Sequence, residues 1–221
     1  STTVASWDAD DNFESNAMKK TVNGGMDAWN PAKYLNIWVC NLSNSSGSGM
    51  TLGYAYLPGL QSWNAWKDGL VIDFQFFGTV GGASASSDGR TATHEIGHYL
   101  GLMHTFCEDT DNQGNPICCD NDNNSWSGNV DDTPATKDIY FGSVTSNTNN
   151  NTCNDLSYAN VFTTDVLDMD ENFMSYATAT WMFSEGQVDV MLATLNTSES
   201  NGGRSKLKSG IVSTNCSGIV S

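Results

Sequence analysis

Basic residues are scarce in this chain. Its 221 residues include 9 Lys and Arg against 25 Asp and Glu, which gives a formal net charge of −16 at pH 7. Nucleic acids and anionic membrane surfaces are bound chiefly through Lys and Arg, so we expect neither as a partner. The acidic surface favours cations and cationic peptides instead.

Long apolar runs are lacking as well. No stretch of about 18 consecutive apolar residues occurs, so we expect no membrane-spanning helix. Hydrophobic residues still make up 38% of the chain and aromatic residues 10%, which argues for a folded core rather than disorder. The chain starts at Ser1 rather than at Met, and we expect a processed chain or a fragment.

The cysteines form no CxxC pair. Their even number, in a chain rich in Asn, Ser, Thr and Gly, favours disulfides and a secreted, extracellular protein. Buried free thiols in a cytosolic protein are the alternative. The pairing stays open, because six cysteines allow about 15 connectivities. The six are Cys40, Cys107, Cys118, Cys119, Cys153 and Cys216.

Hydrophobic patterning predicts strands in the first third of the chain. Residues 34–40, an aromatic and β-branched run, predict a buried strand, and residues 70–77 predict another. Residues 52–57 alternate and stop at Pro-Gly, which is typical of an exposed edge strand. A weaker helix is expected over residues 13–29, broken at a Gly-Gly pair.

Two stronger helices are expected further along. The first covers residues 90–100, and the second, residues 184–195, starts with a capping box formed by Ser184 and Gln187. Residues 107–154 between them are rich in Asp, Asn and Gly and predict irregular structure. An α/β half is thus followed by a smaller irregular half. The second helix should bury a face made of Val188, Met191, Leu192 and Leu195.

All three histidines of the chain lie in one segment, HEIGHYLGLMH at residues 94–104. His94 and His98 are four apart, so on a helix they project from one face and can share a metal ion. A continuing helix would carry His104 about 9 Å further along its axis. Gly101 can end the helix in a left-handed conformation and bring His104 back to the ion.

Three imidazoles with one open position are typical of a catalytic zinc site. Glu95 lies on the flank, where it can reach a zinc-bound water. The five fixed positions occur by chance in such a chain with a probability on the order of 10⁻⁵. The alternatives are three structural histidines or a noncatalytic zinc site, and Glu95 argues against the latter.

This motif resembles that of the metzincin clan of zinc endopeptidases. The clan also has a methionine turn beneath the zinc, which NFMSY at residues 172–176 fits, with Met174 as the apolar floor. Together with HTF at 104–106, GNVDDTPA at 128–135 and YLNIWVC at 34–40, the sequence is similar to the compact microbial form of the pappalysin family, from about residue 30 to 190.

The resemblance implies an α+β fold: a single catalytic domain with a twisted mixed sheet and the active-site helix in an N-terminal subdomain, about 1–101, and an irregular C-terminal subdomain, about 102–221. It also implies peptide-bond hydrolysis, with Glu95 as general base and Tyr176 stabilising the oxyanion. Protein or peptide substrates would bind along the edge strand at 52–57, and the protein would be a monomer.

Calcium is a second implied cofactor. Oxygen ligands at irregular spacing suit Ca²⁺, and pappalysin-like enzymes bind it around the DDTP motif. A solvated acidic loop is the alternative. The candidate ligands are Asp120, Asp122, Asp131, Asp132 and Thr133.

One departure from the family concerns specificity. Relatives that cleave beside Arg or Lys carry acidic residues just after the Met-turn tyrosine, whereas this chain has ATAT at residues 177–180. We therefore expect a preference for uncharged or apolar residues beyond the scissile bond. Two other functions stay open: an inactive binding module that keeps the fold, and a zinc enzyme that acts on a non-peptide amide.

Overall fold

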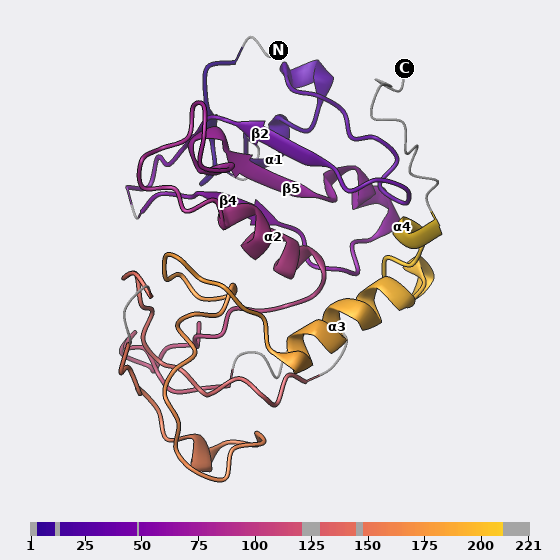
Figure 1. Ribbon diagram of the computed structural model, residues 1–221. Coiled ribbons are helices and arrows are strands. Elements are labelled where there is room, and N and C mark those ends of the chain that lie inside the picture. The colour runs from indigo at the N-terminus through magenta and orange to yellow at the C-terminus, as the bar shows by residue number, and fades with distance from the viewer. Residues whose placement is uncertain (1–3, 12–13, 48, 121–128, 145–147, 210–221) are drawn as a thin grey trace.

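The computed structural model describes residues 4–11, 14–47, 49–120, 129–144 and 148–209. Figure 1 shows the sheet and α2 in one half of the molecule, a loop-rich half facing α2, and α3 alongside both. The strands of the described ranges are β1 Trp7–Asp8, β2 Ile37–Cys40, β3 Leu42–Ser43, β4 Gly53–Ala55 and β5 Leu70–Asp73. The α-helices are α1 Glu14–Ala17, α2 Thr91–Tyr99, α3 Glu185–Asn196 and α4 Lys206–Ser209.

The central sheet is mixed, in the order β2-β5-β4. β2 runs parallel to β5, with Ile37 opposite Leu70, and β4 runs antiparallel to β5, with Gly53 opposite Ile72. β1 and β3 form a separate parallel pair. The expected mixed sheet is confirmed, and so is the edge position of the strand predicted at 52–57.

Two strand predictions need correction. The strand expected to be buried at 34–40 lies at the other edge of the sheet, so Ile37 and Val39 are 40% and 45% exposed. The strand expected over 70–77 ends at Asp73, because the Asp73 carboxylate accepts hydrogen bonds from the backbone N–H groups of Leu42 and Gln75 (2.8 Å each) and turns the chain into a 3₁₀ helix, Phe74–Phe76.

Both faces of β5 are covered, because its side chains alternate. Leu70 and Ile72 pack with Tyr99 and its neighbours on α2, while Val71 packs with Trp7 and Met18 on the other face. The helix expected over 13–29 is reduced to α1 and a 3₁₀ turn, Thr21–Asn23. The chain doubles back there, since the Met26 N–H donates to the Met18 carbonyl (2.9 Å).

The loop-rich half is held by covalent and apolar contacts. Disulfides join Cys107 to Cys119 and Cys118 to Cys153, which confirms the disulfide prediction for four cysteines. Cys40 is a half-buried free thiol, and Cys216 lies outside the described residues. The described parts of 107–154 form no helix or strand, as expected. Val130 from this range packs in an apolar cluster with Leu102, Met174 and Val190.

The capping box of α3 is confirmed. The Gln187 N–H donates to Ser184 Oγ (3.1 Å), and the Ser184 N–H donates to Gln187 Oε1 (3.0 Å). Of the predicted apolar face, Met191 packs against the apolar cluster, but Val188 and Leu192 are 40% and 50% exposed. Polar anchors set the rotation of the helix instead, and its buried residues are Gln187, Val190 and Thr194.

No α-helix in the described ranges is long and apolar enough to cross a bilayer.

The Thr194 hydroxyl donates to the Leu100 carbonyl (2.7 Å), at the end of α2. Arg204, between α3 and α4, donates to the Tyr99 carbonyl (2.7 Å) and pairs with Asp68. The C-terminal helices therefore fix the position of α2 relative to the sheet.

Candidate active site

The end of α2 determines where the third histidine lies. Gly101 has a φ of +103°, the left-handed conformation that glycine tolerates best. Its N–H donates to the His98 carbonyl (2.9 Å), and the Leu102 N–H donates to the Gly97 carbonyl (3.0 Å), which closes the last turn. The predicted helix stop is confirmed, and the chain then returns His104 to the face of α2 that carries His94 and His98.

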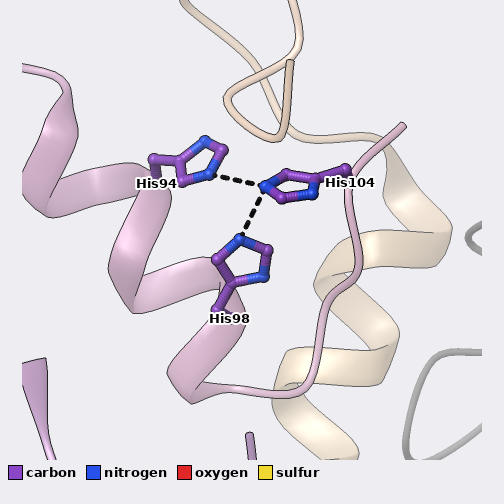
Figure 2. A group of neighbouring side chains, drawn as sticks. All are labelled: His94, His98 and His104. Atoms are coloured by element: carbon purple, nitrogen blue, oxygen red, sulfur yellow. Dashed lines mark hydrogen bonds between the residues drawn. The ribbon is translucent and has the colours of Figure 1, made fainter. Parts of the chain in front are cut away.

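The three imidazoles converge through their Nε2 atoms. His104 Nε2 lies 3.2 Å from His94 Nε2 and 3.0 Å from His98 Nε2. Figure 2 shows the three rings pointing toward one another. Three nitrogens bound to one tetrahedral zinc, at about 2.0–2.1 Å each, would be about 3.3 Å apart. The spacing therefore fits a shared Zn²⁺.

Hydrogen bonds at the other ring nitrogens fix the tautomers. His94 Nδ1 lies 2.7 Å from the Phe173 carbonyl, and His98 Nδ1 lies 2.8 Å from the Leu102 carbonyl. His104 Nδ1 lies 2.9 Å from the Glu108 carboxylate. Each partner is an acceptor, so each Nδ1 carries the proton. The three Nε2 atoms therefore present lone pairs to one another, which a cation between them satisfies.

The protonation states agree with metal binding. Burial is the main cause that lowers the pKa of His94 well below its usual value, and the neighbouring imidazoles lower it further. Burial and then the adjacent His104 lower the pKa of His98 to about 4. Neutral imidazoles are the form that binds a metal. The donor set thus fits zinc by distance, tautomer and charge.

Glu95 lies beside the imidazoles and is 5% exposed. Its Oε2 is buried and has no hydrogen-bond partner among the described residues, and burial raises the pKa of the carboxyl to about 8. A cation held by the three histidines would favour the carboxylate and lower this pKa again. An orphaned buried oxygen here suits a base whose proton donor arrives with the reactants.

The methionine turn lies under α2. Met174 is fully buried, and its N–H donates to Asn172 Oδ1 (2.8 Å). The Asn172 amide donates in turn to Gln187 Oε1 (2.7 Å) in the capping box of α3. Asn172 and Gln187 support the site through a buried polar network that the sequence analysis missed, because their contact spans two separate elements.

Tyr176 lies over the histidines. Its ring centroid is 4.8 Å from that of His104 and 5.6 Å from that of His94. The side chain is 42% exposed, and burial of the hydroxyl followed by Glu108 and Glu95 raises its pKa to about 12. A protonated phenol at the mouth of the site can donate a hydrogen bond.

A cleft of about 490 Å³ opens above these groups. One wall comes from residues 50–53 at the start of β4, where a Cβ on Gly53 would come within 3.2 Å of Glu95 Cγ. The opposite wall comes from the segment after the methionine turn, including Ala177, Thr178 and Thr180. The edge strand, His94, Glu95 and the segment after the methionine turn therefore meet at one cleft.

His104 has two supports that were not predicted from the sequence. Glu108 accepts its Nδ1 proton, and the Phe106 ring stacks on the imidazole with centroids 4.6 Å apart. A carboxylate four residues after a ligand was the available signal for Glu108. Such outer partners orient a metal ligand and raise its basicity.

The candidate calcium ligands are not gathered into one group. Asp132 accepts from Ser184 Oγ (2.7 Å) and the Gly186 N–H (2.9 Å) and thereby caps α3. Thr133 is buried, Asp131 is exposed and Asp120 is half-buried, while Asp122 lies outside the described residues. Over the described ranges, no three of these acids approach within metal-binding distance. The calcium site stays a prediction.

The chain is similar to known metalloproteases, in agreement with the geometry of the site. An extracellular metalloprotease of Pyricularia oryzae is 36% identical over 137 residues, which are 61% of this chain and 39% of that protein. One of Podospora anserina is 35% identical over 109 residues, 48% of this chain and 33% of that protein. The chain spans well under half the length of these curated relatives.

Solved structures match over nearly the whole chain. Mature mirolysin of Tannerella forsythia, in complex with a cleaved peptide, superposes with a TM-score of 0.65 and 30% identity, over 93% of this chain and 66% of that one. The sequence profile of peptidase M43, described as pregnancy-associated plasma protein-A, matches residues 16–196. With the histidine cluster and the methionine turn in place, the chain belongs to the M43, or pappalysin, family of metalloproteases.

Proposed function

We propose that this chain is a secreted, zinc-dependent endopeptidase that cleaves proteins or peptides. The observation that carries the proposal is the convergence of three Nε2 lone pairs beside the orphaned Oε2 of Glu95. Two disulfides and the relatives named extracellular metalloproteases support secretion. Residues 1–101 and 102–221 would act as the two halves of one catalytic domain in a monomer.

His94, His98 and His104 would hold the zinc, which supplies Lewis-acid polarisation of the scissile carbonyl and a water of lowered pKa. Glu95 would accept a proton from the attacking water and pass it to the leaving amine. Its buried position excludes bulk water from that transfer. Tyr176 would donate a hydrogen bond from its phenol to the developing oxyanion.

The substrate would lie along β4 as an added antiparallel strand. β4 pairs with β5 on one side only among the described residues, and its backbone passes close to Glu95. An extended peptide bound there gains main-chain hydrogen bonds and brings a peptide bond past the base. The complex of mirolysin with a cleaved peptide supports a peptide as the substrate.

The residue beyond the scissile bond would face the uncharged segment 177–180. A buried Arg or Lys would find no carboxylate in that segment, and both oxygens of the nearby Asp88 already accept backbone hydrogen bonds. An unpaired buried charge costs several kcal/mol. We therefore propose cleavage before uncharged or apolar residues. Cleavage chiefly before Arg or Lys in a peptide-library digest would contradict this preference.

Calcium in the acidic stretch is a further part of the proposal. Asp120, Asp122, Asp131 and Thr133 would supply oxygen ligands, with Asp132 already used to cap α3. Calcium that binds the native state alone raises the melting temperature by mass action. If a calcium-selective chelator that leaves zinc in place changes neither the melting temperature nor the rate of autolysis, calcium is not structural here.

The activity itself is tested with the zinc-loaded protein, casein and a proteome-derived peptide library. Release of peptides that stops with a zinc chelator and returns with added zinc is expected. A zinc-loaded protein that releases nothing would identify a binding module that keeps the fold. Hydrolysis of small non-peptide amides without any peptide cleavage would identify the remaining alternative.

A further inference from the structure

A single carboxylate joins the loop before α2 to residues 177–180, which form one wall of the cleft. Asp88 lies in the loop before α2, and its Oδ1 accepts a hydrogen bond from the Arg90 N–H (2.9 Å) at the start of that helix. Its Oδ2 accepts from the Ala179 N–H (2.8 Å), 91 residues further along the chain. Asp88 itself lines the cleft together with Ala177 and Thr178.

The backbone at Ala179 is in a conformation that it does not adopt on its own. Its φ of +61° makes it the one non-glycine residue with positive φ in the described ranges. Left-handed backbone is unfavourable for alanine, and it persists where surrounding contacts impose it. The Asp88 carboxylate is the contact that holds the N–H of this residue.

The other side of the wall segment, residues 177–180, is anchored by backbone. The Thr178 N–H donates to the Gly142 carbonyl (2.9 Å), and the Val144 N–H donates to the Thr178 carbonyl (3.1 Å). This ladder ties the outer edge of the segment to residues 142–144. Asp88 ties the segment to the start of α2.

A carboxylate is the side chain that suits this link. It offers two acceptor oxygens, whereas an amide of the same shape offers one. Its charge is also stabilised at the N-terminal end of a helix. The proposed mechanism uses none of these features, because Asp88 neither contacts the histidines nor donates or accepts a proton in hydrolysis.

We propose that Asp88 is a positioning residue that fixes the wall segment against the start of α2 and so sets the shape of the substrate pocket beyond the scissile bond. The consequence for cleavage rests on the proposed peptidase function. The link itself does not, since it is a property of the folded protein.

Hydrogen exchange tests the link without any activity. Exchange of the amides in 177–180 is compared between the wild type, Asp88→Asn and Asp88→Ala. Loss of a hydrogen bond to a charged group should speed exchange at Ala179 about tenfold or more in Asp88→Ala. Asp88→Asn, which keeps one acceptor, should fall between the two. Unchanged exchange in a folded Asp88→Ala protein overturns the proposal.

Two control variants separate the link from general damage. Asp111 also accepts two backbone N–H groups, from Gln113 (2.8 Å) and Asn115 (2.9 Å), in an exposed turn that does not line the cleft. Asp111→Ala should leave exchange in 177–180 unchanged. Ala179→Gly keeps the N–H and accepts positive φ freely, so its amide should stay protected by Asp88. Ala179→Gly also keeps the proposal testable if Asp88→Ala does not fold. Rapid exchange of the amide at position 179 in this variant would overturn the link.

Kinetics tests the consequence. Zinc-loaded Asp88→Ala should show a KM raised about tenfold, a kcat changed much less, and a broader range of residues accepted after the scissile bond. An unchanged KM and cleavage profile, despite faster exchange, overturns the positioning role. A wild type that cleaves no peptide contradicts the proposed function instead, and exchange then still decides whether Asp88 holds the wall.

Discussion

The sulfur of Met174 lies directly against the backbone of Gly97 in α2. A Cβ built on Gly97 would overlap the Met174 Sδ and come within 3.3 Å of its Cε. The methionine turn and the zinc helix are therefore in contact at the one residue of HEIGH that has no side chain. This contact sets the height of His94 and His98 above the turn.

Gly97→Ala should destabilise both the fold and the zinc site. Forcing a methyl group into a filled core typically costs about 1–3 kcal/mol, and relief by moving α2 would displace two zinc ligands. Thermal unfolding and zinc content after dialysis measure the two effects.

Gly82→Ala is the matched control, because a Cβ there meets only Phe74 at an ordinary 3.6 Å. Combining Gly97→Ala with Met174→Ala should cost less than the sum of the two single changes, since the methyl group then has room. If the losses of stability from the two single changes simply add up in the double variant, the two residues do not constrain each other.

Glu108 should increase the affinity for zinc although it is not a zinc ligand itself. Its carboxylate accepts from His104 Nδ1 (2.9 Å), and removing such a partner typically lowers metal affinity about 10–100-fold. We expect a loss of that size in Glu108→Ala and a smaller one in Glu108→Gln, measured by competition with a chromogenic chelator. Glu185→Ala, at an exposed position on α3, is the control. Equal affinities in Glu108→Ala and Glu185→Ala would exclude this role.

Lys19 is a buried base packed among aromatic side chains. It is 1% exposed, and its ammonium donates to the Lys67 carbonyl (2.7 Å). Burial lowers the pKa of Lys19 to about 7, a shift that Asp68 opposes and the charge of Lys67 reinforces. Aromatic rings that favour the charged form surround the ammonium: Tyr56 at 4.5 Å, Trp38 at 5.0 Å and Tyr54 at 5.5 Å.

This shift predicts how stability depends on pH. The unfolded chain, with a lysine pKa of about 10.4, holds more protons than the folded chain between about pH 7 and 10. The contribution of Lys19 to the free energy of unfolding should therefore rise with pH across that window. Urea unfolding at pH 7, 8 and 9 should show the rise in the wild type and in the exposed variant Lys33→Met, but a weaker one in Lys19→Met. The same slope in all three proteins would contradict it.

The parts of the site that follow from local spacing could be predicted from the sequence. His94, Glu95 and His98 depend only on helical periodicity, and the return of His104 depends on one glycine. The capping box at Ser184 is equally local. The edge position of 52–57 could be predicted because its alternation and its Pro-Gly stop lie in the strand itself.

The remaining features depend on partners distant in the sequence. The buried face of α3 is set by Asp132 and by the contact of Gln187 with Asn172, so its apolar pattern alone predicted the face only in part. The burial of Lys19 depends on Trp38, Tyr54 and Tyr56, which lie well beyond it in the sequence. The link from Asp88 to Ala179 crosses 91 residues, and no local pattern indicates it.

The central claim is that Glu95 serves as the general base beside a zinc ion held by three histidines. The most direct measurement is the kcat of zinc-loaded Glu95→Gln and Glu95→Ala on a peptide that the wild type cleaves, with zinc content measured on the same samples. Loss of a general base predicts a fall of about 10²–10⁴-fold or more at full zinc occupancy. Turnover close to that of the wild type, in a variant that holds one zinc per chain, would contradict the account.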